Sequence, residues 1–349
     1  MNTDSSWNRQ VLAAAACTTA ILGGVLFEKW RQSRAGFVRP TKKGQCAPLS
    51  PVAGVGRAVK ATLTLPAEDG LPPLDLDILV ARPPGGGPHC ELDATVPILY
   101  LLDPEPCMFG AAALHAYAAA AYPNGVFFQK LVIVGIGHAG PTFGLGSEGF
   151  DAPSLRDLRR RDFKPTDYWT NETTNSHAQR FLGALATGVI PHVEGRLLGL
   201  VPSQARRRCL MGASFTGVVA MRAALAHPGL CAEVAVGSPS YCFDPDRYEE
   251  IDAYASGLPK PAVFVAVGAL EALGLKLKGN VHDGMVPGVK KLAEKLRARG
   301  FEVEGVESVA WADHSTIKLP FVALALGWFE ERVMGLGYQE TDQTKHEAK

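Results

Sequence analysis

The alternation of apolar runs with amphipathic segments is the feature that most limits what this chain can fold into. Residues 96–102 (VPILYLL) and 131–136 (LVIVGI) are continuously apolar, as strands buried on both faces of a parallel sheet are. Residues 58–65 and 74–81 instead alternate apolar and polar side chains, as half-buried strands do. The remaining predicted strands cover 208–211, 232–237, 262–268 and 302–309, and the predicted helices cover 109–122, 176–193, a segment starting near 216, 286–300 and 317–334. This order predicts an α/β fold whose mostly parallel central sheet carries helices on both faces.

The chain of 349 residues divides unevenly. We expect a polar segment at 1–10, an apolar segment at 11–28, a linker rich in Pro and Gly at 29–56, one domain at 57–337 and a charged tail at 338–349. Residues 11–27 carry no charge, although a membrane-spanning helix usually needs about 20 apolar residues. Membrane association through a transmembrane helix at 11–28 is therefore the expected location. A signal peptide of a secreted protein and a buried helix of a cytoplasmic one are the alternatives.

Composition argues against several kinds of partner. Basic and acidic residues number 35 each, whereas a nucleic-acid-binding domain usually has a basic excess. The seven cysteines are scattered and form no C-x-x-C pair, so the sequence indicates neither a zinc site nor a disulfide framework. We expect no nucleic-acid partner, no metal and no organic cofactor.

The segment Gly212-Ala213-Ser214-Phe215-Thr216 is close to the nucleophile-elbow pattern G-x-S-x-G. In that motif a sharp strand-to-helix turn lifts the serine hydroxyl clear of the sheet, and the next backbone N–H stabilises the oxyanion. Thr216 stands where the pattern has its last glycine, and Gly217 comes one position later. Ser214 is the candidate nucleophile, and the N–H of Phe215 is the candidate oxyanion donor.

A nucleophilic serine needs a base, and the base needs an orienting acid. In an α/β-hydrolase these follow in the order Ser, acid, His. His314 comes directly after the last predicted strand, and Glu271 comes directly after the preceding one. The acid stays open, because Asp244, Asp246 and Asp283 also lie in nearby segments, and His282 is a rival base.

The chain resembles the putative-esterase family of α/β-hydrolases, which includes esterase D, the feruloyl esterases and the ferri-siderophore esterases. The resemblance covers roughly 96–334, and its pieces occur in the family's order: PILYLLDPEP, LVIVGIGH, RRRDFKPTDYW, FLGALATGVIPHV, CLMGASFTGVVAMRAALAHP, VGSPSYCFD, VGALE and DHS. It implies an α/β-hydrolase fold and a Ser214–His314 pair with Glu271 as the acid. The sequence departs from the family at Thr216 and at Pro104, both glycine positions in the family. Because proline has no N–H, the second oxyanion donor falls to the backbone of Glu105.

A G-x-G-x-x-G pattern at Gly135, Gly137 and Gly140 offers dinucleotide binding as a rival function. That site needs a helix directly after the glycines, whose N-terminus holds the pyrophosphate. Pro141 and further glycines follow instead, so we expect a loop that runs close to the active site.

The long segment 138–175 carries the candidate substrate-binding residues, which are Arg160, Arg161, Tyr168 and Trp169. Guanidinium groups and aromatic rings suit an anionic aromatic group. A solvent-facing charge run is the alternative. The sequence therefore predicts a serine carboxylic-ester hydrolase for a small-molecule ester, with siderophore-type or aromatic esters as candidates. The alternative is a catalytically weak or inactive binding protein with the hydrolase fold.

Overall fold

The structure, a computed structural model, describes residues 50–51, 58–66, 73–83, 92, 95–103, 106–120, 127–138, 175–201, 207–243, 247–273 and 284–335. Segments 1–10 and 11–28, the linker 29–56 apart from residues 50–51, and the tail 338–349 lie outside these ranges.

The expectation of a membrane-associated location is corrected. Among the described residues, no helix combines the length and the apolar character that crossing a bilayer requires. The apolar segment 11–28, on which that expectation rested, is not among them.

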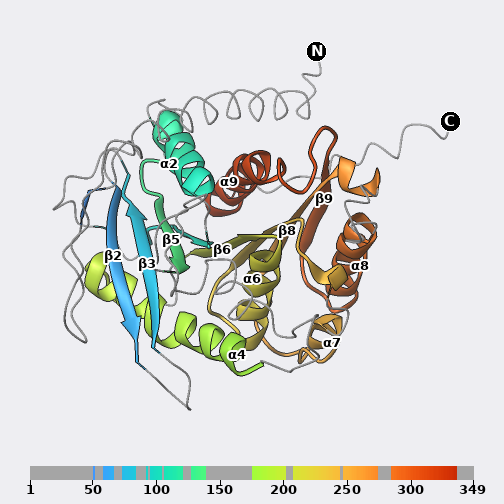
Figure 1. The fold of residues 1–349 in the computed structure, drawn as a ribbon, viewed down its shortest axis with the longest axis horizontal. Coiled ribbons are helices and arrows are strands. Elements are labelled where there is room, and N and C mark those ends of the chain that lie inside the picture. Colours follow the sequence, from blue (N-terminus) through green and yellow to red (C-terminus); the bar gives the residue numbers. More distant parts are fainter. Residues whose placement is uncertain are drawn as a thin grey trace, which may run out of the picture.

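A single mixed sheet forms the centre of the described chain (Figure 1). Its strand order is β1-β2-β3-β5-β4-β6-β7-β8-β9. The first three strands pair antiparallel, as does β3 with β5, and all pairs from β5 to β9 are parallel. The strands are β1 Ser50–Pro51, β2 Ala58–Leu65, β3 Leu74–Ala81, β4 Ile98–Leu102, β5 Val132–His138, β6 Arg208–Ala213, β7 Glu233–Gly237, β8 Ala262–Gly268 and β9 Val303–Val309.

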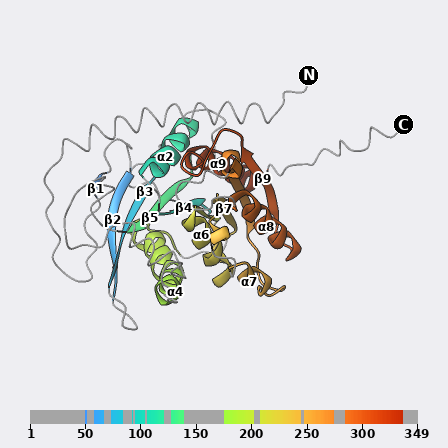
Figure 2. The same cartoon turned by 45° about the vertical axis from the view of Figure 1, so that its right-hand side comes forward.

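Helices cover both faces of this sheet (Figures 1 and 2). One face carries α4, α6, α7 and α8, and the other carries α2 and α9. The α-helices are α2 Pro106–Ala120, α4 Asn175–Ala184, α5 Ile190–His192, α6 Phe215–Ala226, α7 Arg247–Asp252, α8 Met285–Ala298 and α9 Lys318–Met334. Two π-helical segments, η1 Leu185–Val189 and η2 Val193–Leu197, continue α4, and two short 3₁₀-helices are η3 Tyr241–Phe243 and η4 Ala269–Leu273.

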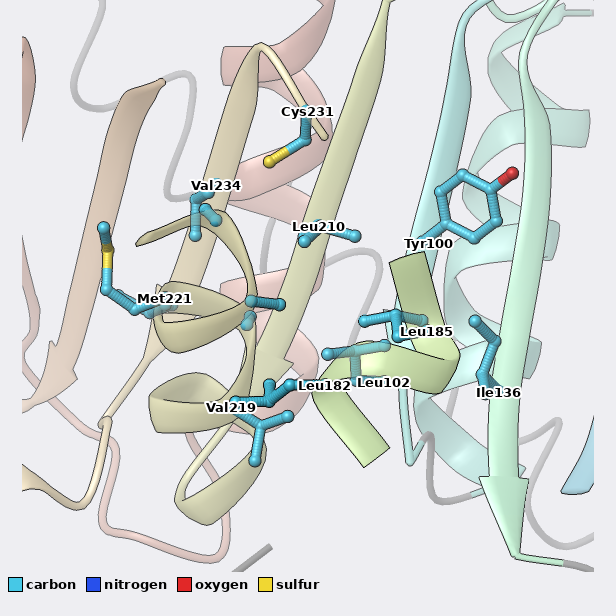
Figure 3. Close-up of a cluster of buried hydrophobic side chains, with 14 of the residues drawn as sticks. Tyr100, Leu102, Ile136, Leu182, Leu185, Leu210, Val219, Met221, Cys231 and Val234 are labelled. Carbon is cyan, nitrogen blue, oxygen red and sulfur yellow. The ribbon is translucent and has the colours of Figure 1, made fainter. Parts of the chain in front are cut away.

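Successive side chains of each central strand enter opposite cores, because side chains alternate across a strand. On β6, Leu210 packs under α4 and α6, whereas Met211 belongs to the cluster beneath α2 and α9. Figure 3 shows part of the first cluster, to which α4 contributes Leu182, α6 Val219 and β6 Leu210. Burial on both faces explains why these strands are apolar without a break.

The helical segment 175–197 is irregular because Pro191 lies inside it. Proline cannot donate an N–H and its ring clashes with the preceding turn, and π-helical turns are one way in which a helix absorbs such a disruption. A buried polar cluster fastens this segment to the sheet. The Glu194 carboxylate accepts hydrogen bonds from Arg208 Nε at 2.6 Å and from the Tyr100 hydroxyl at 3.0 Å.

Candidate active site

Ser214 stands in a sharp turn between β6 and α6. Its backbone has φ 60° and ψ −125°, a conformation that non-glycine residues rarely adopt. Gly212 makes the turn possible, because a Cβ there would lie 2.2 Å from the carbonyl oxygen of Thr216. The chain therefore turns from strand to helix within one residue, and Phe215 begins α6 at the positive end of the helix dipole.

Thr216 fits the turn through its hydroxyl group. This hydroxyl donates to the Ala213 carbonyl at 2.8 Å and accepts from the Ala213 N–H at 3.1 Å, and the residue is buried. The backbone is closely packed at Gly217, one position later. A Cβ on Gly217 would lie 3.1 Å from Cβ of Pro239 and 3.2 Å from the Gly212 carbonyl oxygen.

His314 and Glu271 meet Ser214 in one hydrogen-bonded chain. Nε2 of His314 lies 2.9 Å from Oγ of Ser214, and Nδ1 lies 2.8 Å from Oε2 of Glu271. Glu271 is in η4 directly after β8, and His314 is in the turn after β9. The three residues come from the carboxyl ends of three parallel strands, the edge of an α/β sheet where ligands bind.

Buried hydrogen bonds hold the Glu271 side chain in place. Its Oε1 accepts from the Gly268 N–H at 3.0 Å and from the Ser238 hydroxyl. The side chain is only 2 % exposed, whereas that of His314 is 29 % exposed. The imidazole is therefore accessible from solvent, and the carboxylate behind it is sequestered.

A capped turn carries His314. Asp313 Oδ1 accepts from the Thr316 N–H at 2.8 Å, from the Thr316 hydroxyl at 2.8 Å and from the Ser315 N–H at 2.9 Å. These hydrogen bonds, those from Thr316 first, lower the pKa of the Asp313 carboxyl, because they favour its charged form. The ionised carboxylate thereby holds the backbone that follows His314.

Two residues of the candidate site were not predicted from the sequence. Ser240 Oγ lies 3.1 Å from Ser214 Oγ, and Ser238 donates to Glu271. Both belong to the turn after β7, and the signal was available: two hydroxyl residues follow directly after a predicted parallel strand.

The other predicted site residues lie outside the described part of the chain. These are Glu105, Arg160, Arg161, Tyr168 and Trp169, together with the alternative acids Asp244, Asp246 and Asp283 and the rival base His282. Their assignments stay predictions.

The glycine pattern Gly135, Gly137 and Gly140 begins inside the strand predicted at 131–136. Gly135 and Gly137 lie inside β5, paired with Leu79 and Asp77 of β3. Gly140 lies outside the described residues. The first two glycines are therefore sheet residues, with Gly135 inside the predicted strand and Gly137 just past its predicted end. The loop expected after them falls on residues 139–174, outside the described ranges.

Buried cysteines are poor nucleophiles here. Burial raises the pKa of the Cys209 and Cys231 thiols, because the interior disfavours the thiolate. Within the described ranges, no group of three or more His, Cys, Asp or Glu side chains is arranged to hold a metal ion.

A cavity of about 310 Å³ lies at the opposite edge of the sheet, near the start of β6. Glu194, Arg208 and His227 are among its lining residues. The two charged side chains pair with each other, with Arg208 Nε 2.6 Å from Glu194 Oε1. Ser214 follows the other end of β6, so this cavity is not part of the candidate site.

The strand order and the strand–turn–helix at Ser214 define an α/β-hydrolase fold, which confirms the fold predicted from the sequence. No family model matches the chain, and no curated protein matches its sequence. Solved structures do match. The siderophore hydrolase EstB from Aspergillus nidulans has a TM-score of 0.57 and 18 % identity, over 77 % of this chain and 94 % of its own.

Two further solved structures are similar over comparable lengths. The siderophore hydrolase EstA from Aspergillus nidulans has a TM-score of 0.56 and 18 % identity, over 82 % of this chain and 98 % of its own. An IroE-like serine hydrolase from Shewanella oneidensis has a TM-score of 0.55 and 18 % identity, over 79 % and 81 %. At such identities the likeness shows the fold, and the names of these three hydrolases agree with the esterase family that the sequence resembles.

Proposed function

We propose that this protein is a serine carboxylic-ester hydrolase in which Ser214 is the nucleophile, His314 the general base and Glu271 the orienting acid. The observation that carries the proposal is the continuous chain from Glu271 Oε2 through the imidazole to Ser214 Oγ, with steps of 2.8 and 2.9 Å. Both distances are short enough for the hydrogen bonds that join a nucleophile to its base and the base to its acid.

The reaction has two steps. Ser214 Oγ attacks the ester carbonyl while His314 Nε2 takes the hydroxyl proton, and the resulting tetrahedral intermediate collapses as the C–O bond to the alcohol breaks. His314 returns the proton to the departing alkoxide. Water then attacks the acyl-serine with His314 again as base, and Ser214 Oγ leaves with the returned proton. Glu271 holds Nδ1 protonated and stabilises the imidazolium in both steps.

Oxyanion stabilisation is assigned to the backbone N–H of Phe215, at the N-terminus of α6, and to that of Glu105. Loss of one oxyanion-hole donor costs about 2.7–4 kcal/mol in a serine protease. Glu105 is assigned because Pro104, which precedes it, has no N–H.

The proposed substrate class is an anionic aromatic or siderophore-type ester. Arg160, Arg161, Tyr168 and Trp169 are its proposed binding residues, because guanidinium groups pair with anions and stack on aromatic rings. The names of two similar structures, both siderophore hydrolases, support this class. A binding protein without catalysis is the second candidate. Of the two departures from the family pattern, only Pro104 favours it, because the hydrogen bonds of the Thr216 hydroxyl fit threonine into the turn.

A substrate panel tests the proposal. The full chain is assayed with an aryl acetate, a neutral aromatic ester and a catecholate trilactone, beside the Ser214→Ala variant. We expect turnover of at least one ester and its loss by more than 10³-fold in the variant. Hydrolysis that survives in Ser214→Ala would assign the chemistry to another residue, and no hydrolysis by the unmodified chain would favour the binding protein.

The same panel tests the substrate class. Replacing Arg160 and Arg161 together by Gln should raise KM for the anionic trilactone and leave KM for the aryl acetate unchanged. Equal effects on both would mean that the arginines serve stability, and the substrate class would revert to neutral esters.

A further inference from the structure

The turn Ser238-Pro239-Ser240 after β7 touches both ends of the Ser214–His314–Glu271 chain. Ser240 Oγ lies 3.1 Å from the nucleophile oxygen, and the Ser238 hydroxyl donates to Oε1 of Glu271. Both serines are almost fully buried, at 0 % and 2 % exposure for Ser238 and Ser240. A buried hydroxyl normally has a hydrogen-bond partner, and the partners of these two are side chains of the proposed triad.

We propose that this turn is a fourth part of the active site. Ser240 is a catalytic residue that donates a hydrogen bond to Ser214 Oγ, and Ser238 is a positioning residue that orients the Glu271 carboxylate. The inference rests on the proposed function and adds to it two residues that the triad does not include.

The direction of each hydrogen bond follows from counting protons. An ionised carboxylate only accepts, so Nδ1 of His314 carries the proton that faces Glu271, and Nε2 of the neutral ring is an acceptor. Ser214 therefore donates its single hydroxyl proton to Nε2. The bond between the two serine hydroxyls must then use the proton of Ser240.

This donor acts when charge develops on Ser214 Oγ. The oxygen becomes partly anionic when it attacks the ester, and again when it leaves the acyl carbon in the second step. Hydrogen bonds to charged groups contribute more than those to neutral groups. The Ser240 hydroxyl therefore stabilises both transition states, and it also holds the nucleophile in the orientation that faces His314.

Ser238 acts on the other end of the chain. Its hydroxyl and the Gly268 N–H both donate to Oε1, at 3.0 Å for the N–H. Two donors on one carboxylate oxygen fix the rotation of the group, so that Oε2 is the oxygen that faces Nδ1 of His314. Ser238 holds this position at φ 41°, a strained backbone conformation of the kind that clusters at functional sites.

Backbone contacts fix the turn against the elbow. Ser214 N–H donates to the Gly237 carbonyl at 2.9 Å, and Ser240 N–H donates to the Ser214 carbonyl at 3.1 Å. Pro239 lies against Gly217, where an added Cβ would be 3.1 Å from Cβ of Pro239. The turn therefore packs closely against α6 at Gly217, the glycine one position beyond the expected pattern.

The test compares variants that separate the hydroxyl groups from the backbone. Ser240→Ala removes the donor to the nucleophile, and Ser240→Thr keeps it. Ser238→Ala and Ser238→Gly both remove the donor to Glu271, but glycine also relieves the positive φ. The ester that the unmodified full chain hydrolyses best is the substrate, and urea unfolding checks that each variant is folded.

We expect Ser240→Ala, Ser238→Ala and Ser238→Gly each to lower kcat by about 10- to 100-fold, the range of one hydrogen bond to a charged group, with KM within about twofold. Ser240→Thr should recover most of the lost kcat. Wild-type kcat in Ser240→Ala, or equal losses in the Ala and Thr variants, would overturn the role of Ser240. Wild-type kcat in Ser238→Gly would show that Ser238 matters for its backbone alone and would overturn its positioning role.

A spectroscopic readout separates this inference from the proposed function. The proton on Nδ1 of His314 gives a downfield NMR signal when it is bonded to a carboxylate, and this signal does not depend on turnover. We expect its position to change in Ser238→Ala and Ser238→Gly, because Glu271 loses a donor. An unchanged signal in both variants would overturn the contact, whereas an unmodified chain that hydrolyses no ester would overturn the proposed function itself.

Discussion

Strained single residues mark the edge of the sheet where the candidate site lies. In the described part of the chain, the non-glycine residues with positive φ are Asp103, Ser214 and Ser238, at 45°, 60° and 41°. They directly follow β4, β6 and β7, three neighbouring strands. Such conformations cost about 1–3 kcal/mol each and persist where the surrounding structure enforces them. Their gathering at one edge agrees with a functional role for that edge.

Asp313 gives a pH-dependent prediction at this scale. Its carboxyl has a lowered pKa in the folded chain, so its contribution to stability is present above the unfolded pKa of about 3.9 and is lost as pH falls through the lower folded value. We expect Asp313→Ala to be less stable than the unmodified chain at pH 7. Urea unfolding at several pH values should show this difference shrinking toward zero below about pH 4.

Asp252 supplies the matched control, because this aspartate pairs with Lys295 at the surface, far along the chain from the His314 turn. Asp252→Ala should leave turnover unchanged at pH 7, whereas Asp313→Ala should lower kcat by loosening the turn that carries His314. An Asp313→Ala variant with full stability and full kcat at pH 7 would mean that the capped turn has no part in holding the imidazole.

The sequence predicted which residues meet, but not every residue that supports them. Ser214, Glu271 and His314 were predicted because each follows a recognisable strand, and strand ends of a parallel sheet share one edge. Ser238 and Ser240 were not predicted as site residues, because a serine after a strand is common. Their partners are known only from the strand order, in which β7 lies between β6 and β8. The catalytic roles of all five residues stay proposals.

At the scale of elements, the β6–α6 turn depends on one glycine. A Cβ on Gly212 would lie 2.2 Å from the Thr216 carbonyl oxygen and 2.8 Å from the Gly217 nitrogen, so the strand and the first turn of the helix must separate to accept it. We expect Gly212→Ala to lower the free energy of unfolding by roughly 3 kcal/mol or more, the range of severe steric changes in a core, and to abolish turnover.

Gly183 in α4 is the matched control, because a Cβ there meets nothing within 4 Å. Gly183→Ala should be neutral or stabilising by up to about 1 kcal/mol, since alanine favours a helix. Urea unfolding of both variants makes the comparison. Equal stabilities of Gly212→Ala and Gly183→Ala would show that the close approach at the elbow is not needed.

Strand positions were the most predictable elements. The ranges 58–65, 74–81 and 262–268 coincide with β2, β3 and β8, because alternating or continuous apolar runs state directly which faces are buried. The short helix α7 Arg247–Asp252 was not predicted, since six residues are too few to show a helical period. The π-helical segments were not predicted either, because their one sign in the sequence is Pro191, which lies between them.

At the scale of the whole molecule, the two-faced sheet was predictable and its strand order was not. Continuous apolar strands require cover on both faces, and the structure has α4, α6, α7 and α8 on one face and α2 and α9 on the other. Nothing local in the sequence states that β5 lies between β3 and β4. That order comes from long-range pairing, and it brings Ser214, Glu271 and His314 to one edge.

The most direct test of the account is covalent labelling of the full chain with a fluorophosphonate, because this reagent reacts with an activated serine hydroxyl. The proposed site predicts a single phosphonylated residue, mapped to Ser214 by peptide mass spectrometry. Labelling should be absent in Ser214→Ala and slowed by at least about 10³-fold in His314→Ala, since the base activates the nucleophile. An unlabelled wild-type chain, a label on another serine, or an undiminished rate in His314→Ala would contradict the account.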